Sequence, residues 1–222
     1  MPIKAFLFDL DGVLVDTAVF HYQAWKRLAN EKLGFDISHE FNETLKGISR
    51  TESLERILAQ GNAQISEAEK IELATLKNEW YLELIQQMTP ADILPGVSEF
   101  LAKTRAAGLK IGLGSVSKNA KTILSRVGIS GNFDVIIDGN KITKSKPDPE
   151  VFLKGADELG FFAAECVVFE DALAGIEAAK RAGMIAVGIG QADILTQADL
   201  VFADFTAISF NDFVENIDFQ RN

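Results

Sequence analysis

Several residue types that point to particular protein classes are scarce in this sequence. Its 222 residues include one cysteine, so an internal disulfide is excluded. That residue, Cys166, lies in the apolar run CVVF, which favours a buried structural thiol over a reactive nucleophile. Basic residues are also outnumbered, with 22 Lys and Arg against 32 Asp and Glu and a net charge of −10. Because proteins that bind nucleic acids usually carry a basic surface, we expect no nucleic-acid partner.

Long apolar segments are missing as well. No stretch approaches the roughly 18 consecutive apolar residues of a membrane-spanning helix. The apolar run near the start is too short for a secretory signal and soon meets acidic residues. We therefore expect a cytoplasmic protein without a membrane partner, and a monomer by default. The sequence does contain 47% hydrophobic residues, enough for a substantial core in one large domain or two unequal ones.

Six short apolar runs predict a parallel β-sheet. They are continuous, as in strands that are buried on both faces. The runs cover residues 5–8, 110–114, 134–138, 166–170, 184–189 and 200–203. Helical patterns separate most of them, at 96–108, 117–128, 148–159 and 172–181, and Ser117 is the expected N-cap of the second pattern. This alternation predicts a Rossmann-like, doubly wound α/β fold.

The segment 16–92 breaks the alternation. It has no convincing strand and contains three helical patterns, the last of which is a stripe from Ile71 to Met88. Because the segment follows the first predicted strand, we expect an inserted α-helical cap domain over the carboxyl end of the sheet, where ligands of α/β proteins bind. Residues 1–15 and 93–222 would then form the α/β catalytic core, and residues 16–92 the cap.

Two pairs of carboxylates follow predicted strands. Asp9 and Asp11 end the first strand, with Gly12 permitting a turn, and Glu170 and Asp171 end another. A polar turn is the alternative explanation of the first pair on its own. In a parallel sheet, however, both pairs reach the same edge, where their mutual repulsion calls for a cation. Ligands that are all oxygen, without a cluster of His or Cys, favour Mg²⁺ over zinc.

The same edge gathers groups suited to a phosphate. The run KIGLG leads into Ser115, and Lys146 lies in a loop directly before a helical pattern. The residues that open the helical pattern after Ser115 are Ser117, Lys118 and Asn119. Taken singly, Ser117 is more simply explained as an N-cap and Lys146 as a solvated lysine. Together with the carboxylates, these residues favour a phosphate site.

A carboxylate nucleophile at this edge would need such neighbours. If Asp9 attacked a phosphate with about two negative charges from about 4 Å, the repulsion would be about 8 kcal/mol at an effective dielectric constant near 20. Mg²⁺ between Asp9, Asp171 and a phosphate oxygen, with Lys146 on another oxygen, would cancel that charge and hold the attack in line. The predicted product is a covalent aspartyl phosphate.

These motifs resemble those of the haloacid dehalogenase-like superfamily of phosphotransferases. The motifs appear in order as DLDGV from Asp9, Ser115 after an apolar strand, Lys146 before Pro147, and the acidic pair Glu170-Asp171. The resemblance implies that Asp9 is the phosphorylated nucleophile, that Asp11 is the general acid/base, and that Ser115 and Lys146 hold the transferring phosphate. The protein ligands of Mg²⁺ that it implies are Asp9, Asp11 through its backbone carbonyl, Glu170 and Asp171.

Within that superfamily, the chain resembles the sugar phosphomutases. The segments that carry this resemblance are DLDGVLVDTAVFHYQAW, LKGISRTESL, GSVSKN and PADILPG. It implies a phosphomutase, an isomerase that interconverts β-D-glucose 1-phosphate and glucose 6-phosphate through an aspartyl-phosphate enzyme and β-glucose 1,6-bisphosphate. The implied partner is thus a small sugar phosphate, and the implied cofactor is Mg²⁺.

The same resemblance implies roles for residues of the cap. Thr17 and His21, four apart on one helix face, would position Asp11 when the cap closes. By themselves they are more typical of a surface polar pair or of a histidine with its hydrogen bonds satisfied in the fold. The residues implied to grip the non-reacting phosphate are Arg50, Ser117, Lys118 and Asn119. The residues implied to line the sugar site are Trp25, Gly47, Ile48, Ser49, Arg50, Thr51, Glu52, Lys77 and Val116. Core packing of Trp25 and a solvated Lys77 are the alternatives.

Two departures from the family pattern and two other functions bear on this prediction. Val116 stands where the family pattern has a smaller residue, and Ala172 stands where it commonly has a serine or threonine. Both departures bear on the predicted sugar specificity more than on the predicted reaction. The shared motifs also suit an Mg²⁺-dependent sugar-phosphate or phosphoglycolate phosphatase. A non-catalytic module that binds sugar phosphates is disfavoured, because binding alone does not need both a nucleophile and an acid/base.

Overall fold

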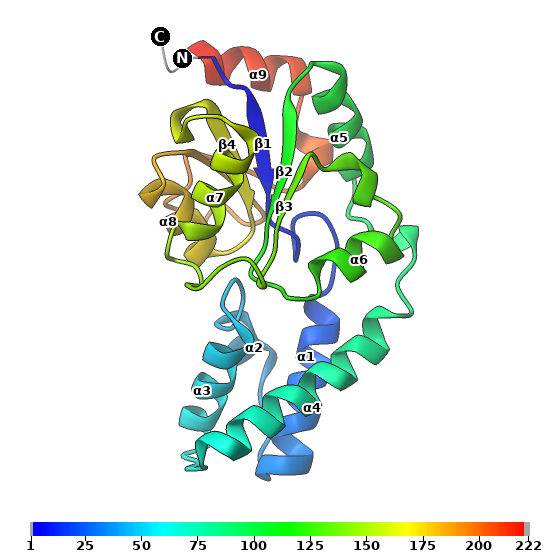
Figure 1. The fold of residues 1–222 in the computed structure, drawn as a ribbon, viewed down its shortest axis with the longest axis vertical. Helices are drawn as coiled ribbons and strands as arrows, with labels where there is room; N and C mark the ends of the chain where they lie inside the picture. The colour runs from blue at the N-terminus through cyan, green and yellow to red at the C-terminus, as the bar shows by residue number, and fades with distance from the viewer. Residues whose placement is uncertain (1, 220–222) are drawn as a thin grey trace.

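A parallel β-sheet forms the centre of the structure (Figure 1), a computed structural model that describes residues 2–219. The strand order is β3-β2-β1-β4-β5-β6, and every pair is parallel. The strands are β1 Ala5–Phe8, β2 Lys110–Gly114, β3 Val135–Ile137, β4 Cys166–Glu170, β5 Ile185–Ile189 and β6 Leu200–Phe202. All of them lie within the predicted runs, so the doubly wound α/β fold is confirmed.

Helices cover both faces of the sheet (Figure 1). Side chains of a strand alternate between faces, so Phe6 and Phe8 of β1 enter one buried cluster and Ala5 and Leu7 enter the other. The helices of the first cluster are α5 Val97–Ala106, α6 Ala120–Arg126 and α9 Phe210–Phe219, and those of the second are α7 Glu150–Leu159 and α8 Leu173–Arg181. Because each strand is apolar on both sides, its run in the sequence is continuous.

The start of α6 differs from the prediction. The helix begins at Ala120 with Asn119 in the N-cap position, so Ser117 is not its N-cap. The Ser117 Oγ instead accepts the backbone N–H of Asn119 at 3.2 Å, which is a local turn of the kind that competes with helix formation. Residues 117–119 therefore form a loop between β2 and α6, and Asn119 joins this loop to the helix as its N-cap.

Residues 16–92 form a group of helices beyond one end of the sheet (Figure 1). They comprise α1 Ala18–Leu28, a π-helical turn Ala29–Leu33, α2 His39–Glu43, α3 Arg50–Gln60 and α4 Glu67–Ile85. Trp25, Leu54 and Ile57 belong to a separate buried cluster, so this segment has a core of its own. The predicted stripe of the last helix is wrong at its first position, because Ile71 is 69% exposed. None of the helices among the described residues is long and apolar enough to cross a membrane.

The helical segment leaves the sheet and returns to it at neighbouring positions. Val15 and Ile93 form an isolated antiparallel bridge, and the Leu94 amide donates to the Leu14 carbonyl at 3.0 Å. The helices α1 to α4 are thus attached beside the carboxyl end of β1, where Asp9 follows.

The short 3₁₀ turns of the described residues are Pro90–Asp92, Ser130–Asn132, Ala163–Glu165 and Phe205–Ala207.

Candidate active site

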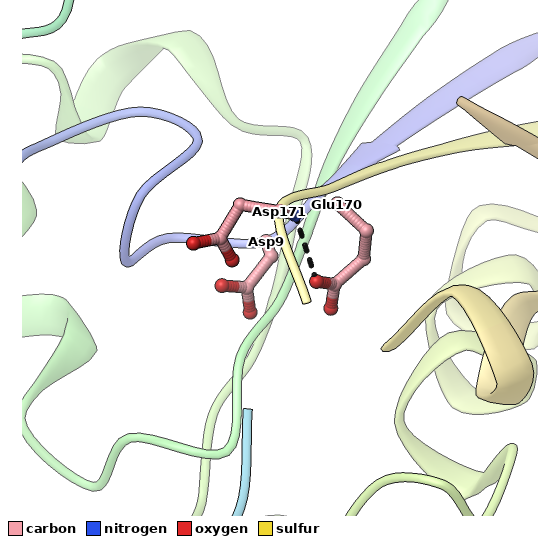
Figure 2. Close-up of side chains that lie close together, drawn as sticks. All are labelled: Asp9, Glu170 and Asp171. Carbon is pink, nitrogen blue, oxygen red and sulfur yellow. Dashed lines mark hydrogen bonds between the residues drawn. The ribbon is translucent and has the colours of Figure 1, made fainter. Parts of the chain in front are cut away.

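Three carboxylates meet where β1 and β4 end. Phe8 pairs with Phe169 in the sheet, and the Asp9 amide donates to the Phe169 carbonyl at 3.0 Å, so Asp9 lies beside the last residues of β4. Asp9, Glu170 and Asp171 each offer an oxygen, and these oxygens lie within 4.8 Å of one another. Figure 2 shows the three side chains together and the hydrogen bond from the Asp171 amide to the Glu170 carboxylate, at 3.1 Å.

Two glycines lie so close to these carboxylates that a side chain at either position would collide with them. A β-carbon on Gly12 would lie 2.1 Å from the Asp171 Oδ2, and Gly12 has a φ of +79°, which favours glycine. A β-carbon on Gly175 of α8 would lie 1.9 Å from the Glu170 Oε1. The donors are all carboxylate oxygens, without nitrogen or sulfur, so the site fits a hard divalent cation such as Mg²⁺.

Lys146 supplies the positive charge beside this cluster. Its Nζ lies 2.5 Å from the Asp9 Oδ1 and 2.5 Å from the Glu170 Oε1, and the Lys146 and Glu170 side chains have no exposed surface. Burial raises the pKa of Glu170 to about 7 even though Lys146 opposes that rise. Burial by itself would lower the pKa of Lys146, but Asp9 and Glu170 raise it above its usual value. The solvated-lysine alternative is therefore wrong, and Lys146 is a buried cation.

Asp11, the second carboxylate after β1, is not part of this three-carboxylate cluster. The Thr17 hydroxyl donates a short hydrogen bond to its Oδ1, and the Asp11 amide donates to the Asp9 Oδ2 at 3.1 Å. Burial, followed by the charge of Asp9, raises the pKa of Asp11 to about 6. A carboxyl group with a pKa near neutrality can both accept and donate a proton, as a general acid/base must. Thr17 is completely buried, so the surface-pair alternative is wrong for it.

His21 and Lys77 form a second polar pair on the helical segment. The His21 Nδ1 lies 2.9 Å from the Lys77 Nζ, which also lies 4.6 Å from the ring centroids of both Trp25 and Tyr81. Burial, followed by the charge of nearby Arg50, lowers the pKa of Lys77 well below its usual value. Lys77 is 2% exposed, so it is not the solvated lysine of the alternative interpretation.

A cavity of about 430 Å³ lies between the sheet edge and the helical segment. Its lining includes most of the predicted site residues, namely Asp9, Asp11, His21, Trp25, Gly47, Ile48, Ser49, Arg50, Thr51, Lys77, Val116, Ser117, Lys118, Asn119 and Asp171. Trp25 both lines this cavity and packs in the helical core. The structure therefore brings together residues from two segments that are far apart in the sequence.

Some predicted residues lie behind the cavity wall or turn away from it. The lining does not include Thr17, Ser115, Lys146 or Glu170, and all four are buried behind it. The Ser115 Oγ accepts the Ser117 amide at 3.1 Å, which shapes the loop after β2. Glu52 also lies outside the lining, and its carboxylate accepts a hydrogen bond from Arg56 at 2.8 Å.

The structure adds residues that the sequence interpretation missed. Lys46, Asn78 and Tyr81 line the cavity, and the Asn119 Nδ2 donates to the Asn78 Oδ1 at 2.8 Å, which links the loop after β2 to α4. The helical pattern containing Lys77 also contains Asn78 and Tyr81, so their proximity to Lys77 was an available signal. Lys46 lies in a turn without periodicity, where no such signal exists.

Comparison with known proteins places this site in a family. A family model described as haloacid dehalogenase-like hydrolase matches residues 3–183. The chain belongs to the haloacid dehalogenase-like hydrolase family. One relative, the β-phosphoglucomutase of Bacillus subtilis (strain 168), is 48% identical to this chain over 201 residues. These residues cover 90% of this chain and 88% of the relative.

Two further comparisons describe the range of this similarity. A crystal structure of β-phosphoglucomutase from Clostridium difficile matches this haloacid dehalogenase-like hydrolase with a TM-score of 0.95 and 46% identity, and covers 99% of both chains. The phosphorylated carbohydrates phosphatase of Thermotoga maritima is 30% identical over 185 residues, which cover 82% of each chain. The superfamily resemblance stated from the sequence is confirmed.

Proposed function

We propose that the protein is a β-phosphoglucomutase that interconverts β-D-glucose 1-phosphate and glucose 6-phosphate through β-glucose 1,6-bisphosphate. One observation carries the choice of a mutase. Cationic side chains lie in two places, Lys146 buried beside Asp9 at the sheet edge, and Arg50 and Lys118 in the cavity lining. A ligand with phosphate groups at both ends suits this distribution. The similarity to two β-phosphoglucomutases supports the same conclusion.

The proposed reaction moves one phosphoryl group at a time through Asp9. The 6-hydroxyl of β-glucose 1-phosphate gives its proton to Asp11 and attacks the phosphorus of the Asp9 phosphate, whose bond to the Asp9 oxygen breaks. After the resulting bisphosphate has turned round, the Asp9 carboxylate attacks the phosphorus at C1, the bond from that phosphorus to the sugar oxygen breaks, and Asp11 returns the proton to that oxygen, which gives glucose 6-phosphate and the aspartyl phosphate. Lys146 and Ser115 would hold the phosphoryl oxygens. Mg²⁺ held by Asp9, Glu170, Asp171 and the Asp11 carbonyl would supply charge compensation.

We assign the helical residues 16–92 to a cap domain and residues 1–15 with 93–222 to the catalytic core. The cap would serve to exclude water and to align Asp11 through Thr17 and His21, so that a sugar hydroxyl reacts in preference to water. The residues proposed to hold the non-reacting phosphate are Arg50, Ser117, Lys118 and Asn119. The remaining lining from Trp25, Gly47–Thr51, Lys77 and Val116 would contact the sugar, whereas Glu52 is left out because it faces Arg56.

A phosphatase is the second candidate, since the phosphorylated carbohydrates phosphatase of Thermotoga maritima is similar over most of its length. Phosphorus NMR of the protein with β-glucose 1-phosphate, a bisphosphate primer and Mg²⁺ distinguishes the two. The mutase predicts a glucose 6-phosphate signal, while inorganic phosphate as the sole product would overturn the proposal in favour of hydrolysis. Cytoplasmic location and a monomeric state stay predictions from the sequence, and light scattering on the purified protein tests the second.

A further inference from the structure

A second cavity reaches the candidate metal site from another direction. Its volume is about 690 Å³, and the lining residues that it shares with the first cavity are Gly12, Ala18, Lys46, Ile48 and Asp171. Its lining contains four carboxylates, those of Asp16, Glu43, Asp171 and Asp204, against two cationic side chains, Lys46 and Arg56. A divalent cation can therefore approach Asp171 past the other carboxylates without passing through the space proposed for the sugar.

Lys46 lies at the boundary between the two cavities. It belongs to the turn between α2 and α3, and its Nζ lies 2.8 Å from the Glu43 Oε2 on the same segment and 4.0 Å from the Asp171 Oδ2 on the sheet edge. The backbone of this turn is close to the strand end, because a β-carbon on Gly47 would lie 3.1 Å from that of Ala172. The ammonium group of Lys46 is thus shared between a carboxylate of the cap and a candidate metal ligand.

The three clustered carboxylates form ion pairs with two different lysines. In the part of the chain that the structure describes, the ion pairs of Lys146 are with Asp9 and Glu170, whereas the ion pair of Asp171 is with Lys46. Burial and the neighbouring carboxylates raise the pKa of Asp171, while Lys46 acts in the opposite direction. Lys46 is one-third exposed, at 33% of its side chain, so it can move away, unlike the buried Lys146.

We propose that the ammonium group of Lys46 partly compensates the charge of Asp171 in the metal-free protein and so competes with the divalent cation, keeping only its contact with Glu43 when the cation binds from the second cavity. This inference rests on the proposed Mg²⁺ site. A cation between the three carboxylates removes the negative charge that attracts Lys46, and by linkage Lys46 weakens cation binding to the same extent. In the metal-free protein, the contact between Lys46 and Asp171 holds the turn that contains Lys46 at the sheet edge. When the cation binds, this contact is lost and the turn can move.

Isothermal titration of Mg²⁺ into the purified protein, without substrate and at constant ionic strength, tests the competition. Lys46→Met should bind Mg²⁺ about two- to fivefold more tightly than the unaltered chain, which is the range expected for losing a partly exposed ion pair. Lys46→Arg keeps the charge and should bind within twofold of the unaltered chain. Lys144→Met removes an equal charge from the lining of the first cavity, where Lys144 pairs with Asp148, and should also change affinity by less than twofold.

Each other outcome overturns the inference. Equal or weaker binding by Lys46→Met, with normal binding by the unaltered chain, would reject the competition and leave the metal site standing. Equal tightening by Lys46→Met and Lys144→Met would show a general effect of net charge and not a shared ligand. No Mg²⁺ binding by the unaltered chain at millimolar concentration would reject both this inference and the proposed metal site.

Discussion

Replacement of Lys146 by methionine gives the largest stability change that we expect from one substitution at the site. The Lys146 Nζ lies 2.5 Å from an oxygen of Asp9 and 2.5 Å from an oxygen of Glu170. At an effective dielectric constant near 20, each contact contributes about 7 kcal/mol before the cost of burying the charges. Because that cost is several kcal/mol for each ion, we expect the net loss on breaking the pairs to be about 3–5 kcal/mol.

Urea unfolding in EDTA at pH 8 measures this loss, since Glu170 is then ionised. The midpoint for Lys146→Met should fall well below that of the unaltered chain, and Mg²⁺ should narrow the difference because it can compensate the same carboxylates. Lys141→Met is the matched control, because Lys141 pairs with Glu158 at 2.8 Å with both side chains partly exposed and should contribute at most about 1 kcal/mol. Equal midpoints for Lys146→Met and the unaltered chain would refute the role of Lys146 as the buried counter-charge.

Three other predictions concern metal binding, the dependence of stability on pH, and the contact between α4 and the loop after β2. Gly12→Ala places a methyl group 2.1 Å from the Asp171 Oδ2, so Mg²⁺ affinity in titration calorimetry should fall at least tenfold; unchanged affinity would contradict the ligand assignment. Burial raises the pKa of Glu170 from 4.5 to about 7, so the folded metal-free chain holds a proton that the unfolded chain loses, and its stability should fall as pH rises from about 4.5 to 7. The rise in melting temperature on adding Mg²⁺ should therefore be larger at pH 8 than at pH 5.5, and an equal rise at both would count against this reasoning. Asn78→Ala removes the 2.8 Å hydrogen bond to Asn119, so X-ray scattering should show a larger radius of gyration, whereas an unchanged radius would mean that this bond does not hold the two parts together.

The sheet and its carboxylates could be predicted from the sequence because both depend on local patterns. A strand buried on both faces leaves a continuous apolar run, and the acidic residues directly after two such runs meet because parallel strands end at one edge. Asp9 and Glu170 follow this rule, whereas Lys146 was expected at a phosphate oxygen, and its ion pairs with both carboxylates were not predicted. The burial of Lys146 was not expected, because a lysine before a helix in a loop is normally solvated.

The cap could be predicted as helical, but its contacts with the core could not. Lys77 lies in the charged stretch ATLKNEW, and only the positions of the Trp25 and Tyr81 rings explain its burial. Ile71 shows the opposite error, because its place in the apolar stripe of a helix predicted burial, whereas its side chain is exposed. Such outcomes depend on how elements pack across the chain, which local periodicity does not encode.

Because Val15 and Ile93 lie side by side, the helical segment is joined to the sheet at a single point. The entropy of closing a loop rises only slowly with its length, so a longer, shorter or unrelated insertion can be joined at the same two residues without separating β1 from its neighbours. The carboxylates and Lys146 then stay in place while the surface opposite them is exchanged. Evolution can thus change the substrate by replacing one inserted segment and keep the phosphoryl chemistry intact.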